Sequence, residues 1–171
     1  RDLAFLNKGI NLYITDEREL EENGNGNGNG SGEEHGAEEL SAEPHFRNEH
    51  FYSEEGLKEF VSYLDATREK LIEDIIYIDT IKNNTPVELA LQYNTSFSEN
   101  VHSYVNNINT IEGGTHLSGF RRGLTRTLKS YAEKSGMLAK LKFDISGDDF
   151  REGLTAIISV KVAEPQFEGQ T

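Results

Sequence analysis

The sequence predicts a mixed α/β fold for this chain of 171 residues. Residues 86–94 and 154–162 place apolar side chains at alternate positions, which is typical of strands that bury one face. Apolar residues at helical spacing predict a helix over residues 54–66 and a longer one over residues 117–135, which Gly136 would end. The length is enough for one domain with a hydrophobic core.

The start of the chain is expected to be the end of a helix followed by a strand. Leu3 and Leu6 recur at helical spacing within residues 1–8, and Gly9 is a suitable C-terminal stop. Residues 10–15 alternate apolar and polar side chains, which predicts a strand. The chain has no initiating Met and none of the features of a signal peptide, so we expect it to begin inside a longer protein.

Further strands are expected at residues 74–81 and 101–107. Residues 95–98 join the strand at 86–94 to the strand at 101–107, and these two strands are expected to form an antiparallel pair. The stretch 144–153 predicts a short helical turn, whose candidate N-caps are Ser146 and Asp148.

Residues 21–45 form a low-complexity segment in which Asn-Gly occurs four times in succession and acidic residues follow. The segment has almost no apolar side chains, so burial cannot compensate for the entropy lost on ordering. We expect a flexible loop or a variable insertion here, and a charged interaction arm is the alternative.

The composition is acidic: the chain has 17 Lys and Arg residues and 30 Asp and Glu residues, for a formal net charge of −13. A uniformly acidic surface repels nucleic acid, so contact with DNA requires a local basic patch. The lack of cysteine excludes disulfides, thiolate zinc sites and cysteine nucleophiles, and it fits a reducing compartment. No apolar run approaches the roughly 20 residues of a membrane span.

The helix expected at residues 117–135 has a basic side and an apolar side when its residues are placed about 100° apart. The basic side is suited to following DNA phosphates, and equally to being a solvated surface paired with carboxylates such as Glu133. The residues alone leave both interpretations open. The four cations are Arg121, Arg122, Arg126 and Lys129, and the apolar side comprises Phe120, Leu124, Thr127, Leu128 and Tyr131.

Gly113-Gly114-Thr115-His116 separates a strand from this helix. The two glycines predict a tight turn with unusual backbone dihedral angles, after which a hydroxyl group, that of Thr115, would cap the helix. A phosphate group bound at the helix N-terminus is the alternative. Neither a P-loop nor a Gly-x-Gly-x-x-Gly signature is present, so a structural turn is favoured.

No residue pattern indicates a catalytic or metal site. Asp148 and Asp149 are adjacent carboxylates with only Glu152 nearby, so we expect them to cap a short helix. The five histidines lack the spacing of metal ligands. They are His35, His45, His50, His102 and His116.

Four motifs stand in order along the chain: Tyr104-Val105-Asn106-Asn107-Ile108-Asn109-Thr110, Glu112-Gly113-Gly114-Thr115-His116, Gly153-Leu154-Thr155-Ala156 and Pro165-Gln166-Phe167-Glu168-Gly169-Gln170-Thr171. With this spacing they resemble the DNA gyrase B family, over most of the chain outside residues 21–45. The first motif favours gyrase over the related topoisomerase IV protein, which tends to have a leucine and a proline in that stretch.

The resemblance implies a two-layer α/β transducer fold, similar to the second domain of ribosomal protein S5. That fold contains a left-handed βαβ crossover, which is an exception to the right-handed rule. The resemblance also implies that residues 1–9 end a preceding GHKL-type ATPase domain and that residues 10–171 form the transducer domain.

An ATP-driven mechanism is implied as well. In this family, two B subunits close around a captured double-stranded DNA segment, and transducer domains line the cavity and carry the nucleotide state to a gate formed with the A subunit. The helix with Arg121, Arg122 and Arg126 matches the arginine helix of that cavity, and Lys129 extends it. A cytoplasmic protein with no membrane partner is implied.

Gln170 and Thr171 match the first two positions of a Gln-Thr-Lys loop that reaches into the ATP site of gyrases. ATP and Mg²⁺ are therefore implied for the full-length protein, bound mainly outside this segment, and the segment alone is not expected to be catalytic. Three alternatives remain: the corresponding part of topoisomerase IV, a self-contained nucleotide-binding module that uses the Gly113-Gly114 corner, and a scaffold.

Overall fold

The computed structural model describes most of the chain, namely residues 1–20, 46–141 and 144–167. Two compact units are formed, one by residues 1–10 with 52–171 and the other by residues 11–51. The insertion predicted at residues 21–45 and the predicted nucleotide-loop residue Gln170 lie outside the described residues.

The larger unit is built on a five-stranded sheet with the strand order β3-β4-β7-β5-β6. β7 runs antiparallel to β4 and parallel to β5, while β3 and β6 pair antiparallel at the two edges. Every residue of β7 is buried because this strand lies at the centre of the sheet and both of its faces are covered. The strands are β3 (Ile76–Lys82), β4 (Thr85–Tyr93), β5 (Asn100–Val105), β6 (Ile108–Asn109) and β7 (Leu154–Val160).

β4 and β5 run in opposite directions, but they do not pair with each other as expected from the sequence. β7 lies between them: Ile158 is the partner of Leu89 in β4 and of Ser103 in β5. Alternation identifies a strand with one buried face but does not identify its neighbours, because many pairings satisfy the same pattern. The crossover from β5 to β7 runs through α3, and its implied left-handed course stays a prediction.

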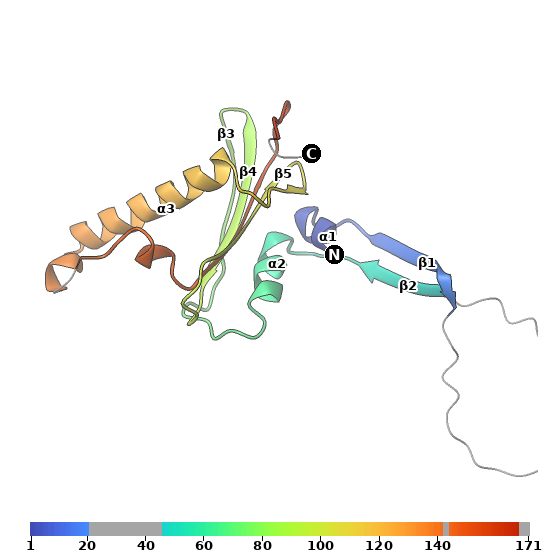
Figure 1. The fold of residues 1–171 in the computed structure, drawn as a ribbon, viewed down its shortest axis with the longest axis horizontal. Coiled ribbons are helices and arrows are strands. Elements are labelled where there is room, and N and C mark those ends of the chain that lie inside the picture. Colours follow the sequence, from blue (N-terminus) through green and yellow to red (C-terminus); the bar gives the residue numbers. More distant parts are fainter. Residues whose placement is uncertain (21–45, 142–143, 168–171) are drawn as a thin grey trace, which may run out of the picture. The chain divides into compact units, whose positions relative to one another are not determined.

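One face of this sheet is covered by α2 (Leu57–Leu64), with α1 (Asp2–Leu6) packed against it (Figure 1). Phe60 is buried at the centre of this layer, and the ring of Phe5 stacks on it with the ring centroids 4.8 Å apart. Glu59 accepts hydrogen bonds from the backbone N–H groups of Glu54 and Glu55, which precede the helix, and so ties the entering chain to its first turn.

A buried polar cluster joins the end of α2 to the sheet. Asp65 accepts hydrogen bonds from Thr155 Oγ1 at 2.6 Å and from Asn94 Nδ2 at 3.0 Å. Arg68 Nη1 forms an ion pair with the same carboxylate at 3.1 Å. Because Asp65, Asn94 and Thr155 are buried, these contacts replace the water that each polar group loses on folding.

The opposite face of the sheet is covered by the first half of α3 (Thr115–Lys134), whose Phe120 and Leu124 pack against strand residues. Figure 1 shows the second half of the helix extending beyond the sheet. Tyr131 is 63% exposed there and Thr127 is also exposed, so the apolar side expected from the sequence is wrong at these two positions. The mixed α/β class is confirmed: α2 and the sheet form two layers, and α3 adds a partial third.

Gly136 ends α3 as expected, with a left-handed φ of 72°. Its N–H donates to the carbonyl oxygen of Glu133 at 3.1 Å, and Met137 N–H donates to that of Ala132 at 3.0 Å, which is the Schellman pattern. Two short 3₁₀ turns follow, η1 (Leu138–Lys140) and η2 (Asp149–Arg151).

The smaller unit is a hairpin of two antiparallel strands, β1 (Leu12–Leu20) and β2 (Phe46–Phe51). The strand predicted at residues 10–15 overlaps β1 only at residues 12–15, and β1 continues to Leu20. The sequence pattern did not predict β2, because polar residues occupy most of its positions. Tyr13 stacks on His50 across the two strands, with the ring centroids 4.5 Å apart.

Candidate functional site: the basic helix and the pocket at its N-terminus

Positive charge is concentrated on α3 in an otherwise acidic chain. The helix contains five basic residues and one acidic residue. Arg122, Arg126 and Lys129 are exposed, and none of them forms an ion pair or a side-chain hydrogen bond with another described residue. A polyanion can therefore bind these three side chains without first breaking a contact within the described chain.

Arg121 differs from the other three predicted cations because a carboxylate holds it. Arg121 Nε donates to Glu99 Oε1 at 2.6 Å. Arg121 follows the buried Leu117 by four residues, so it stands one turn further along the packed side of the helix. The structure therefore places Arg122, Arg126 and Lys129 together on the open side and places Arg121 at the boundary with the sheet.

Gly113 and Gly114 form the corner that precedes α3. Gly113 has a left-handed φ of 87°, which confirms the predicted tight turn. Gly114 is the N-cap and no side chain caps the helix, so the predicted capping by Thr115 is wrong. A Cβ atom on Gly114 would stand 2.8 Å from His116 Cε1, and the glycine therefore leaves space for the imidazole ring.

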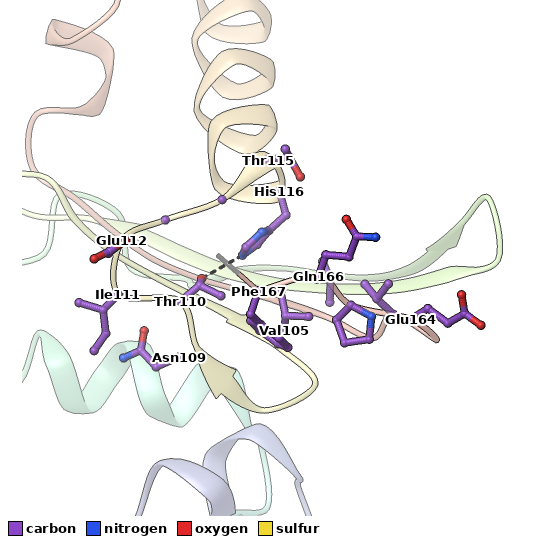
Figure 2. Close-up of a pocket in the computed structure, with 15 residues that line it drawn as sticks. Val105, Asn109, Thr110, Ile111, Glu112, Thr115, His116, Glu164, Gln166 and Phe167 are labelled. Atoms are coloured by element: carbon purple, nitrogen blue, oxygen red, sulfur yellow. Dashed lines mark hydrogen bonds between the residues drawn. The ribbon is translucent and has the colours of Figure 1, made fainter. Parts of the chain in front are cut away.

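His116 joins the first turn of α3 to the residue after β6. Its Nε2 lies 3.2 Å from Thr110 Oγ1 (Figure 2), and Thr110 Oγ1 donates to the carbonyl oxygen of Ser103 at 2.9 Å. Because the Thr110 hydroxyl proton is used there, we assign His116 Nε2 as the protonated donor. Burial lowers the pKa of His116 below its usual 6.5, which favours the neutral ring.

A pocket of about 860 Å³ lies beside this corner, between the loop after β6 and the segment that follows β7 (Figure 2). Glu112 and Glu164 line it, and no lysine or arginine does so among the described residues. A nucleoside triphosphate carries several negative charges, and these two carboxylates would repel it. Among the described residues, the lining of this pocket therefore disfavours the phosphates of ATP.

The adjacent carboxylates after α3 have structural roles. Asp149 Oδ2 accepts the N–H of Ser146 at 2.7 Å, and Ser146 Oγ accepts the N–H of Asp149 at 3.3 Å, a reciprocal capping pair. Of the two predicted N-caps, Asp148 occupies the N-cap position of η2, but its side chain pairs with Arg151 and makes no capping bond. The side chain of Ser146 makes the bond to the backbone instead. In the described ranges, no three His, Asp or Glu side chains gather as a metal site, and no helix is long and apolar enough for a membrane span.

Sequence reasoning missed Glu99 and Arg151. Arg151 Nε donates to Glu99 Oε2 at 3.3 Å, although the two residues are 52 positions apart in the chain. No local motif marks either residue, because their contact depends on β5 and β7 being neighbours in the sheet. The strand pairing would have provided the signal, since it brings the start of β5 beside the start of β7.

Comparison with known proteins gives a consistent result. Residues 56–171 match the protein family described as DNA gyrase B. The DNA gyrase B protein of Eisenibacter elegans is 60% identical over 171 residues, and that of Cytophaga hutchinsonii is 59% identical over 171 residues. Each alignment covers the whole of this chain and 32% of the relative, so the chain spans about a third of these relatives' length.

A solved structure supports the same relationship. The 43K ATPase domain of Thermus thermophilus gyrase B, in complex with an aminocoumarin, superposes with a TM-score of 0.74 at 28% sequence identity. The match covers 98% of this chain and 39% of that chain. The arrangement of sheet and helices described above is therefore similar to part of that structure.

Proposed function

Because the chain belongs to the DNA gyrase B family, we propose that it is the transducer segment of an ATP-dependent type IIA DNA topoisomerase. In this role it couples ATP binding and hydrolysis, performed by the full-length protein, to DNA strand passage and negative supercoiling. Residues 1–9 would then end the preceding ATPase domain, and residues 10–171 would form the transducer domain. The segment alone is not catalytic in this proposal.

The exposed basic side of α3 is the observation that carries this proposal. Arg122, Arg126 and Lys129 are free of partners within the described chain, and Arg121 adds a fourth cation at the edge. In a chain of net charge −13, such a local concentration of positive charge needs a reason other than solubility. A surface that contacts phosphates of double-stranded DNA provides one.

The proposed partners follow from the same role. Two B subunits would associate when ATP binds, and the A subunit would supply the gate through which DNA passes, giving an A₂B₂ assembly. This assembly would act in the cytoplasm. Gln170 would belong to the nucleotide loop, where it approaches ATP bound mainly by the rest of the full-length protein together with Mg²⁺. The acidic lining of the pocket beside α3 supports this division, because it is unsuited to phosphate.

DNA-stimulated ATP hydrolysis by the full-length B subunit with its A subunit tests the proposal. We expect charge reversal in Arg122→Glu/Arg126→Glu to weaken stimulation by DNA, because both substitutions place carboxylates against phosphates. A matched control is Lys70→Glu/Lys82→Glu, which changes the net charge equally at exposed positions outside α3. Equal stimulation in both variants across a salt series would contradict the proposal.

A self-contained nucleotide-binding module is the alternative of a different class. It predicts that the 171-residue chain binds a non-hydrolysable ATP analogue by itself. Calorimetric titration of that analogue into the chain distinguishes the two functions. We expect no heat of binding, whereas saturable binding would require the Gly113-Gly114 corner to hold phosphate in spite of the carboxylates nearby.

A further inference from the structure

Glu99 is shared by two arginines from different elements. It stands directly before β5, and its side chain is 23% exposed. One oxygen accepts from Arg121 of α3 at 2.6 Å, and the other accepts from Arg151 of η2 at 3.3 Å. The carboxylate therefore links the basic helix to the turn that leads into β7.

Arg151 is fixed by several contacts at once. Its Nη1 donates to Thr125 Oγ1 at 3.0 Å and to the carbonyl oxygen of Gly147 at 2.9 Å, while its Nη2 pairs with Asp148. The side chain is only 16% exposed. Since the guanidinium group is rigid and its nitrogens are engaged, Arg151 holds Glu99 in one place.

Arg121 has the opposite character. Its side chain is 41% exposed and makes one polar contact within the described residues, through Nε. The four N–H bonds of its Nη1 and Nη2 atoms therefore remain available, and they are the donors that bind phosphate oxygens in pairs. Arg122 and Arg126 have no such restraint, so they lose more side-chain freedom when they bind a partner.

We propose that Glu99, held by Arg151, is a positioning residue that presents the two outer nitrogens of Arg121 to a DNA phosphate. This inference rests on the proposed function of α3. Glu99 does not neutralise Arg121 completely, because Arg151 shares the same carboxylate. Asp148, the second partner of Arg151, is 89% exposed, and water screens its charge. Arg121 is thus the pre-oriented member of a set whose other members are exposed and without a side-chain partner in the described chain.

The test measures binding of a short duplex DNA to the full-length B subunit in the presence of a non-hydrolysable ATP analogue, across a salt series. Arg121→Gln removes one phosphate contact, so we expect the slope of log affinity against log salt to fall by about 0.9. Glu99→Gln keeps the contact between Arg121 and the phosphate, but it weakens the interaction that orients the Arg121 side chain. It should lower affinity roughly fivefold at every salt concentration with an unchanged slope.

Three further variants separate positioning from folding. Glu99→Gln in the Arg121→Gln background should cause no additional loss, because there is no arginine left to orient. Arg151→Lys retains the positive charge but loses the fork of N–H donors that holds Glu99. It should lower the affinity as Glu99→Gln does, and it therefore provides the same test if Glu99→Gln folds poorly. Glu99→Asp should restore part of the affinity.

The outcomes distinguish this inference from the proposed function. Tighter binding and a steeper salt slope in Glu99→Gln would mean that Glu99 competes with DNA for Arg121, and the positioning role would be wrong. Unchanged binding in both Glu99→Gln and Arg151→Lys, with weaker binding in Arg122→Gln/Arg126→Gln, would also overturn it and leave the proposed function standing. Unchanged binding in all of these variants would overturn both.

Discussion

α2 and α3 cover opposite faces of the same sheet, but they differ in how much of each helix is buried against it. α2 buries Leu57, Phe60 and Val61 among its eight residues. α3 buries only Leu117 and Ala132 among its twenty and exposes most of its cations. The comparison indicates that packing on the α2 side contributes more to the stability of the fold, whereas the main role of α3 is to provide an exposed basic surface.

The composition of α3 agrees with this contrast. Gly119 and Gly123 lie inside the helix, where glycine is a poor helix former. A Cβ atom added at either position would meet nothing within 4 Å, so no neighbouring group requires the small residue. On the α2 side, by comparison, Asp65 is buried and bonded to three other side chains.

The largest expected effect contrasts one phenylalanine from each helix. Phe60→Ala should lower the free energy of unfolding by about 3–5 kcal/mol, because a fully buried ring leaves a cavity. Phe120→Ala, which removes a half-buried ring, should cost about 1–2 kcal/mol. Urea unfolding of the 171-residue chain measures both. Equal losses would show that α3 is packed as firmly as α2.

A smaller effect of opposite sign is expected at Gly123. Gly123→Ala should raise the stability of the 171-residue chain by about 0.5–1 kcal/mol, because alanine favours the helix and meets no neighbour. Gly153→Ala is the contrasting control: its added Cβ would overlap the carbonyl oxygen of Asn94 at a position with φ of 73°. The midpoint temperature of thermal unfolding should rise for Gly123→Ala and fall for Gly153→Ala.

The smallest effect concerns pH. Burial lowers the pKa of His116 below 6.5, so the unfolded chain takes up a proton before the folded chain does. The contribution of His116 to the free energy of unfolding is therefore fully present above about pH 6.5, and it declines as the pH falls toward the folded pKa. His116→Gln should remove this decline in urea unfolding measured between about pH 6.5 and 5.

A second acid-dependent loss belongs to the α2 side and occurs at lower pH. Hydrogen bonds from the backbone, the N–H of Glu55 first, hold the pKa of Glu59 below 4.5. Its contribution to stability is present above about pH 4.5 and is lost as the pH falls below that value.

For the His116 prediction, a decline in stability below pH 6.5 that persists in His116→Gln would show that another group causes it.

The sequence predicted individual elements better than their arrangement. Alternation located β4, β5 and β7 to within about two residues, because each strand has one apolar face. It failed to place β7 between the other two, since that order depends on contacts distant in the chain. The sequence pattern did not predict β2, because a hairpin strand with polar residues on both faces has no hydrophobic period.

The candidate site shows the same division. Counting residues around the helix grouped Arg121 with Arg122 and Arg126, and the exposure of the latter two agrees with that grouping. The restraint on Arg121 comes from Glu99, which no helical period can reveal. Likewise, Thr115 has the chemistry of an N-cap, but the turn at Gly113 places Gly114 in that position instead.

The most direct test compares DNA affinity and stability in one variant, Arg122→Gln/Arg126→Gln of the full-length B subunit. We predict that the slope of log affinity against log salt falls by about 0.9 for each phosphate contact removed. We also predict that the same substitutions change the free energy of unfolding of the 171-residue chain by less than about 0.5 kcal/mol. Both side chains are exposed and unpaired within the described chain. An unchanged slope with unchanged affinity would contradict the account, because it would mean that the basic side of α3 does not contact DNA.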